Sequence, residues 1–150
     1  MRYFAYSQKE FVYKYVVMLS DIDQFKHMSF ANYLKLMFLA TDALLLDLQQ
    51  YQEFIQSTRL KTYYSRMQFK NQTVFGDNIL IKVNSSCVEQ EKFKLLFTYV
   101  IEDTGTLVAL GKLDMGLVNC NSSQGISIPS GLSNLLRSIE VDEANLLYKY

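Results

Sequence analysis

The spacing of apolar residues changes along the chain, and these changes divide it into elements. Residues 11–19, FVYKYVVML, are rich in aromatic and β-branched side chains, which is typical of a strand. From Ala31 to about Leu48 the apolar residues recur at spacings of three, four and seven, which predicts a helix with Ser29 at its N-cap. This helix is unusually apolar, so we expect it to be covered on most sides by a sheet that wraps it.

From Lys61 onward the pattern is that of strands joined by short connections. The predicted strands are Thr62–Phe69, Asn78–Val88, Phe93–Glu102 and Leu107–Val118. Residues 71–77 and 103–105 contain glycine and read as turns. A helical turn at 51–58 and a closing helix at 130–139, after the only proline, complete the pattern. This order predicts a single α+β domain over residues 1–150, an antiparallel β-sheet wrapped around one long apolar helix.

Composition narrows the partners and the compartment. Of 150 residues 49% are hydrophobic, enough for a core, and fifteen basic residues balance fifteen acidic ones, which argues against nucleic acid or an anionic membrane. Cys87 and Cys120 are too few for a disulfide framework and lie in strand-like runs, so we expect small, buried, reduced side chains. Met1 to Glu10 lacks the apolar core of a signal peptide, and no run approaches the roughly 18 apolar residues of a membrane span. We therefore expect a soluble, cytoplasmic protein.

The junction between the first strand and the long helix carries most of the candidate chemistry. Residues 21–33 include the only histidine, His27, the carboxylates Asp21 and Asp23, and Asn32 and Tyr33 on the first turns of the helix. Amides at the start of a helix lack acceptors and the helix dipole favours negative charge there, which suits chemistry on a polarised carbonyl. The chain has no phosphate-binding glycine loop and no Gly-x-Ser-x-Gly motif, and with one His and no Cys cluster we expect neither metal nor cofactor.

Three segments occur in an order found in a known family. A strand leads into Asp21-x-Asp23, with His27 four residues and Tyr33 ten residues after the second acid. Residues 74–77, VFGD, form a turn before an apolar strand, and residues 128–132, IPSGL, begin the closing helix. Together they resemble the hotdog-fold acyl thioesterases of the 4-hydroxybenzoyl-CoA thioesterase type, over about residues 11–137. Residues 30–35, FANYLK, are most similar to thioesterases that release chains from enediyne-type polyketide synthases.

The resemblance implies a cofactor-independent enzyme that hydrolyses an acyl thioester, carried on CoA or an acyl carrier protein, to a free acid. The similarity to the polyketide synthase thioesterases further implies an enzyme of polyketide or fatty acid metabolism. Asp23 would be the general base or nucleophile, and amides around Met28 to Ala31 would stabilise the oxyanion. The implied site residues are Asp23 and His27 for catalysis and Met28, Ser29, Phe30, Asn32 and Tyr33 for substrate binding. The site would lie between the subunits of a homodimer or homotetramer, which would also cover the exposed edges of the sheet.

The residues themselves leave alternatives open. Asp23 can also be interpreted as a loop or capping carboxylate. His27 can be interpreted as a packed loop residue, and Tyr33 as a core aromatic whose hydroxyl has a hydrogen-bond partner. Asp21 is interpreted as a strand-end carboxylate and Asp77 as part of a turn.

Two other hypotheses remain, and departures from the family pattern support the first of them. Lys26 replaces the glycine before the histidine, Met28-Ser29-Phe30 replaces Val-Asn-Asn, and Phe38 and Leu39 occupy helix positions that are commonly acidic. Thr41 stands where a basic residue is often found. The first alternative is a non-catalytic hotdog protein that binds acyl thioesters. The second is a dehydratase-like hotdog enzyme, which usually pairs a His with an acid across a dimer, and only His27 could serve there.

Overall fold

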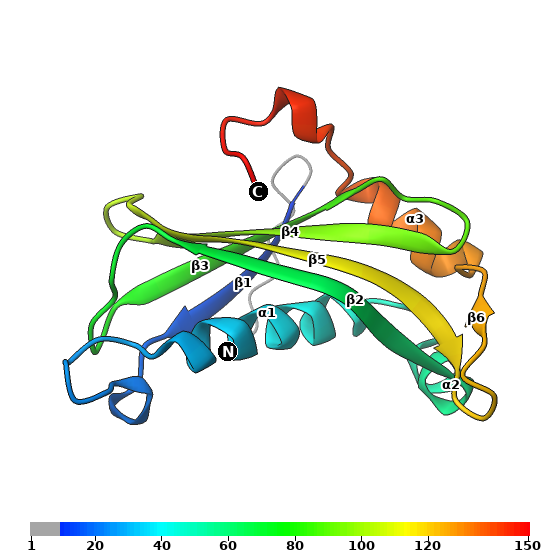
Figure 1. The fold of residues 1–150 in the computed structure, drawn as a ribbon, viewed down its shortest axis with the longest axis horizontal. Coiled ribbons are helices and arrows are strands. Elements are labelled where there is room, and N and C mark those ends of the chain that lie inside the picture. The colour runs from blue at the N-terminus through cyan, green and yellow to red at the C-terminus, as the bar shows by residue number, and fades with distance from the viewer. Residues whose placement is uncertain (1–9) are drawn as a thin grey trace.

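Five long strands and one short strand form a single antiparallel sheet in the computed structural model, which describes residues 10–150 (Figure 1). The sheet order is β1-β3-β4-β5-β2, with β6 beside β5. The strands are β1 (Phe11–Val16), β2 (Thr58–Phe69), β3 (Asn78–Ser86), β4 (Lys92–Ile101), β5 (Leu107–Asn119) and β6 (Gly125–Ile126). The helices are α1 (Phe30–Leu45), α2 (Tyr51–Ser57) and α3 (Ser130–Ser138), with short 3₁₀ helices η1 (Leu19–Asp21) and η2 (Glu143–Asn145). The signal-peptide prediction for Met1 to Glu10 lies outside the described residues, except for Glu10.

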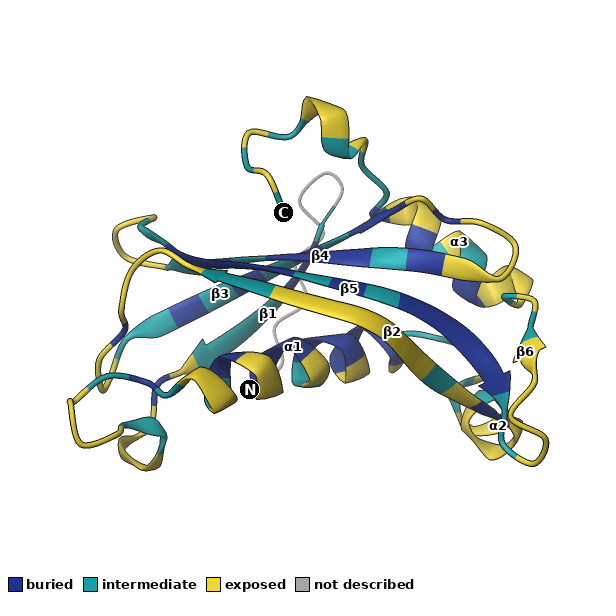
Figure 2. Ribbon diagram, viewed as in Figure 1, coloured by how far each residue is buried: buried dark blue, intermediate teal, exposed yellow. Residues whose placement is uncertain are grey.

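The core lies between α1 and one face of the sheet. Alternate residues of β3 and β4, such as Ile81 and Phe97, are fully buried, and so are Met37 and Leu44 on the facing side of α1 (Figure 2). This alternation follows from the two-residue period of a strand, which sends every second side chain to the same face. The predicted α+β architecture, an antiparallel sheet around one long helix, is therefore confirmed.

Two contacts hold α1 close to the sheet. The Tyr99 hydroxyl on β4 donates a hydrogen bond of 2.7 Å to the backbone oxygen of Tyr33 in the first turn of α1. Further along, Gly111 of β5 lies beneath Met37, so near that an added Cβ would stand 2.5 Å from the Met37 sulfur. The position of the helix start is thereby fixed by the sheet.

The outer side of α1 is not covered in the single chain. Phe30, Leu34 and Phe38, spaced four residues apart on one stripe of the helix, are exposed by 69%, 39% and 43%. The prediction that the helix is covered on most sides is therefore wrong for one copy, because the sheet packs against only one face. The cysteine prediction also needs correction: Cys87 is exposed and Cys120 is half-buried, because both follow the ends of their strands rather than lie within them.

Strand β2 forms one edge of the sheet and is exposed along most of its 12 residues (Figure 2). Among residues 10–150 it pairs with β5 alone, with an irregular register between Thr62 and Tyr64. Its exposed aromatic residues include Tyr63 and Tyr64, at 47% and 49%. A long edge with unpaired backbone groups is a surface on which another strand can pair.

The last residues of the chain pack on the sheet face opposite α1, as Figure 1 shows. Glu143 forms an ion pair of 3.3 Å with Lys112 of β5, and Gln68 of β2 donates to the backbone oxygen of Lys149 at 3.1 Å. The sequence pattern missed this segment and β6, because both are too short to show a period. Among the described residues, none of the helices has the length and hydropathy that a membrane span requires.

Candidate active site

The loop between β1 and α1 is organised around Asp23. Its Oδ1 accepts hydrogen bonds from the backbone N–H of Phe25 at 2.8 Å and of His27 at 3.4 Å. The backbone N–H of Asp23 donates to the His27 oxygen at 2.9 Å. Between them Lys26 adopts a left-handed backbone conformation with φ of 65°, which glycine adopts with the least steric strain. The Asp23 side chain is exposed. Its direction is fixed, because Oδ1 accepts hydrogen bonds from the backbone of its own loop.

Asp21 fastens this loop to the rest of the structure. Its Oδ2 accepts from the Tyr15 hydroxyl at 2.6 Å and from the Met18 N–H at 2.8 Å. Its backbone oxygen accepts from the Asn32 side-chain amide at 3.1 Å. Burial, and then the bond to Asp21, raise the pKa of Tyr15 to about 12. These contacts agree with the interpretation of Asp21 as a strand-end residue, and they engage Asn32 in the same structural role.

Tyr33 is buried and its hydroxyl is satisfied. The hydroxyl lies 2.8 Å from Thr73 Oγ1, a fully buried group in the loop between β2 and β3, and burial raises the pKa of Tyr33. In the same loop, the Asp77 carboxylate accepts the Val74 N–H at 2.9 Å beside Gly76, as expected of a turn. Tyr33 is therefore a core aromatic as well as a wall of the site described next.

A cavity of about 660 Å³ lies at the start of α1. All of the implied site residues except Asn32 line it: Asp23, His27, Met28, Ser29, Phe30 and Tyr33. The sequence missed the other walls, which are Phe25 in the loop and residues 69–72 at the end of β2. The Phe69 ring stands 4.5 Å from the Phe30 ring and 5.2 Å from the Tyr33 ring. No local motif predicts residues 69–72 as site residues, because only the folding of the chain brings them to the cavity.

The backbone amides at the helix start differ in what they donate to. The Met28 N–H donates to the Thr73 oxygen at 3.2 Å and the Ser29 N–H to the Asp21 oxygen at 3.3 Å. Ser29 is at the N-cap as predicted, but its side chain makes no capping hydrogen bond. The N–H groups of Phe30 and Ala31, as first-turn donors, have no acceptor within the helix. These two amides are therefore the ones that a developing negative charge could use.

The chemistry of the cavity is that of a carboxylate, an imidazole and aromatic walls. Among the described residues that line it, Lys70 is the one lysine or arginine and Asp23 the one carboxylate. Within residues 10–150, no group of three or more His, Cys, Asp or Glu side chains is arranged to hold a metal ion. Asp23 and Phe30 line the same cavity, so a fixed carboxylate and the start of a helix can face one polarised carbonyl there.

An antiparallel sheet against a long central helix, with a polar site at the helix start, defines a hotdog protein. The family model of the Thioesterase-like superfamily matches residues 17–136, and the chain belongs to this family. The predicted resemblance is thereby confirmed, and so, at the level of the family, is the prediction of a thioester hydrolase. A search of curated protein sequences finds no match.

Solved structures share the fold over most of their length. The dynemicin thioesterase superposes with a TM-score of 0.83 at 18% identity, over 89% of this chain and 99% of that one. A Staphylococcus aureus protein in complex with CoA gives 0.79 at 19% identity, over 90% and 86%. The 1,4-dihydroxy-2-naphthoyl-CoA thioesterase from Synechocystis gives 0.78 at 16% identity, over 85% and 96%. At these identities the similarity establishes the fold.

Proposed function

We propose that the protein hydrolyses an acyl thioester to a free acid, with Asp23 as its general base or nucleophile. The observation that carries the proposal is the meeting of three features at the start of α1, where the cavity lies. A carboxylate fixed by its own loop, the unengaged N–H groups of Phe30 and Ala31, and aromatic walls all lie at the start of α1. Each feature matches a requirement of acyl transfer.

Two routes are open to Asp23. Since Oδ1 accepts the Phe25 N–H, Oδ2 is the oxygen that can take a proton from water as the water attacks the carbonyl carbon. The Phe30 and Ala31 amides would hold the resulting oxyanion until the C–S bond breaks and the thiolate leaves with the proton. In the second route Oδ2 attacks the carbonyl, the thiolate leaves, and water hydrolyses the mixed anhydride. His27 would orient the thioester beside this oxygen.

CoA is the carrier that we propose first. Two of the similar structures bear on this choice: one is a CoA thioesterase and another contains CoA. An acyl carrier protein is the second candidate, because it presents the same kind of thioester and the dynemicin thioesterase shares the fold. We also propose a cytoplasmic location, which suits the two free cysteines, since disulfides are rare in a reducing compartment.

The proposal includes a homodimer paired along β2. This edge strand is 12 residues long and largely exposed, and its outer backbone groups need partners. A two-fold axis at the strand centre would pair two copies of β2 antiparallel and join the two sheets. A tetramer would additionally cover the exposed stripe of α1 formed by Phe30, Leu34 and Phe38.

The experiment is hydrolysis of a panel of acyl-CoA thioesters by wild type, Asp23→Asn and Asp142→Asn. Asp142 is the matched control: its Oδ1 accepts the N–H two residues later at 3.0 Å, as Asp23 does, but it lies in the C-terminal segment. We expect Asp23→Asn to lower kcat by about 10²–10⁴-fold, the usual contribution of general acid–base catalysis, and Asp142→Asn to keep wild-type activity. Equal kcat for wild type and Asp23→Asn would exclude Asp23 from the mechanism.

The second candidate function is binding of acyl thioesters without hydrolysis. It is favoured by Lys26, which keeps a left-handed backbone at φ of 65° where the family pattern has glycine. This candidate predicts that wild type binds an acyl-CoA in calorimetry while releasing no free CoA. Release of CoA that depends on Asp23 would exclude it.

A further inference from the structure

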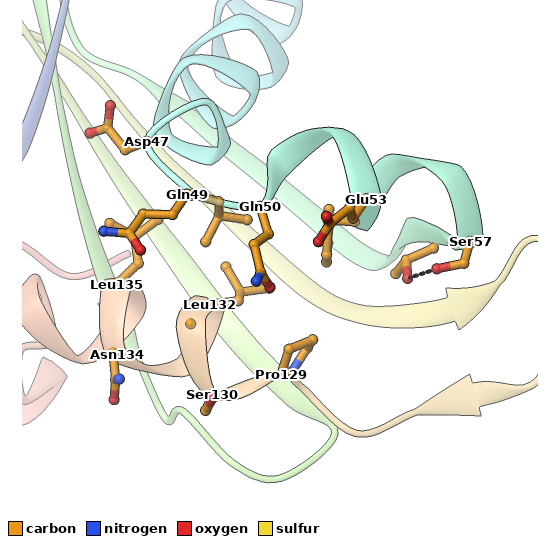
Figure 3. Close-up of a pocket in the computed structure, with 14 residues that line it drawn as sticks. Asp47, Gln49, Gln50, Glu53, Ser57, Pro129, Ser130, Leu132, Asn134 and Leu135 are labelled. Carbon is orange, nitrogen blue, oxygen red and sulfur yellow. Dashed lines mark hydrogen bonds between the residues drawn. The ribbon is translucent and has the colours of Figure 1, made fainter.

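A second cavity, of about 680 Å³, lies far along α1 from the candidate active site. It is bounded by the turn after α1, by α2 and by the start of α3 (Figure 3). Its apolar surface includes Leu48, Phe54 and Leu132. Gln50 extends from the start of α2 toward Leu132 and Pro129 on the α3 side, as Figure 3 shows. Nothing in the proposed hydrolysis uses this cavity within a single chain.

The polar groups that line this cavity favour one kind of ligand. They include the carboxylates of Asp47 and Glu53 and the amides of Gln49 and Gln50. No lysine, arginine or histidine of the part of the chain that the structure describes lines it. Such a surface offers hydrogen-bond acceptors and negative charge over an apolar floor. It therefore suits a chain that ends in a hydroxyl or amino group, and it disfavours phosphates.

Strand β2 joins the two cavities. Its first residue, Thr58, lines the second cavity, and its last, Phe69, lines the candidate active site. Both side chains lie on the sheet face that packs on α1, because Leu60 and Met67, each two residues away, pack against the core. Within one chain, eleven steps of about 3.3 Å separate the ends of β2 by about 36 Å.

Pairing of two β2 strands removes this separation. If the two-fold axis lies near the register irregularity between Thr62 and Tyr64, Thr58 of one copy falls opposite Phe69 of the other. Paired strands lie about 5 Å apart, so each second cavity then adjoins the active-site cavity of the opposite copy on the same face.

We infer that the second cavity of one subunit forms the far end of the acyl pocket of its partner and selects acyl chains that carry a hydroxyl or amino group at that end. This inference rests on the proposed hydrolysis and on the β2 dimer. The partner's Glu53 and the partner's Gln50 accept hydrogen bonds from the terminal group, while Asp23 of the first subunit acts on the thioester.

The first test compares octanoyl-, 8-hydroxyoctanoyl- and 8-aminooctanoyl-CoA, with a C12 series for longer reach. We expect kcat/KM to favour the substituted chains by about tenfold, the effect of one hydrogen bond to a charged group. A double variant, Glu53→Gln with Gln50→Leu, should lose this preference, because the KM values of the substituted chains rise to that of octanoyl-CoA. The control variant Glu91→Gln should keep the preference for substituted chains, because Glu91 is an exposed hairpin residue that lines neither cavity.

The second test assigns the two cavities to subunits. A mixed dimer joins an Asp23→Asn subunit to a subunit with the Glu53 and Gln50 changes. If the pocket is shared, one site of this dimer is fully wild type, so the dimer has half the wild-type activity with the wild-type preference. Activity without the preference would show that each chain uses its own cavity and would overturn the inference.

The inference can fail while the proposed function stands. Octanoyl-CoA hydrolysis with no preference for substituted chains, or a preference unaffected by the double variant, would overturn it. A monomer in light scattering would do the same. If the protein releases no CoA, the three thioesters are compared by Kd in calorimetry, where equal affinities would also overturn it.

Discussion

Replacing Gly111 by alanine tests how closely α1 is held against the sheet. Gly111 lies on β5 and has an ordinary strand conformation, so the backbone accepts an alanine without strain. The added Cβ would stand 2.5 Å from the Met37 sulfur and 3.4 Å from Met37 Cγ and Phe97 Cβ. The close approach of helix and sheet depends on the missing side chain.

The magnitude follows from these distances. Non-bonded heavy atoms rest at about 3.5–4.0 Å, so the Met37 sulfur must move by at least about 1 Å. Met37 and Phe97 are fully buried, so it has little room to do so. Overpacking of this kind costs about 1–3 kcal/mol, and the reduced freedom of the unfolded chain offsets about 0.5–1 kcal/mol of it. Taking the middle of both ranges, we expect Gly111→Ala to lower the free energy of unfolding by about 1 kcal/mol.

The assay is urea unfolding at fixed protein concentration, followed by tyrosine fluorescence and circular dichroism, since the chain has no tryptophan. With a slope of about 2 kcal/mol/M the midpoint should fall by about 0.5 M. Gly131→Ala is the matched control, because nothing lies within 4 Å of its added Cβ in α3 and alanine favours a helix. A Gly111→Ala midpoint equal to that of wild type would refute the steric argument.

Two further predictions concern the loop before α1. Lys26→Gly should raise the free energy of unfolding by up to about 1 kcal/mol, because it removes the cost of a left-handed non-glycine residue at φ of 65°; a urea midpoint no higher than that of Lys26→Ala would contradict this. The folded state raises the pKa of Tyr15 to about 12, from 10.0. Its stabilising contribution is therefore complete below pH 10 and is lost as the pH rises toward 12. The free energy of unfolding should fall over this range more steeply in wild type than in Tyr15→Phe, and equal slopes would contradict the assignment.

The periodicity of the sequence identified each long element and some of its ends, such as the starts of β3 at Asn78 and β5 at Leu107, but not all of them. The start of β2 was predicted at Thr62 and is observed at Thr58, directly after α2. The extra residues are strand because they pair with Gly116 to Asn119 of β5, a contact that no local pattern reveals. Similarly, the spacing of apolar residues in α1 could not distinguish a face covered by the sheet from one left open on a single copy.

The sequence likewise predicted only part of the candidate site. Spacing and family resemblance pointed to Asp23, His27 and the helix start, because these residues are neighbours in the chain and form one loop. The opposite wall, residues 69–72, and the partner of the Tyr33 hydroxyl, Thr73, lie about forty residues away. Only the return of β2 along the sheet brings them to the start of α1.

The order of elements, the family and the loop around Asp23 follow from the sequence alone, because they depend on local spacing and short-range hydrogen bonds. Which helix-start amides remain available depends instead on how the whole chain folds. The amide of Met28 is taken by Thr73, which belongs to a distant loop, and that of Ser29 by the backbone of Asp21. The amides of Phe30 and Ala31 are left, and their availability depends on where the chain returns, since hydrogen bonds between distant segments form only in the folded protein.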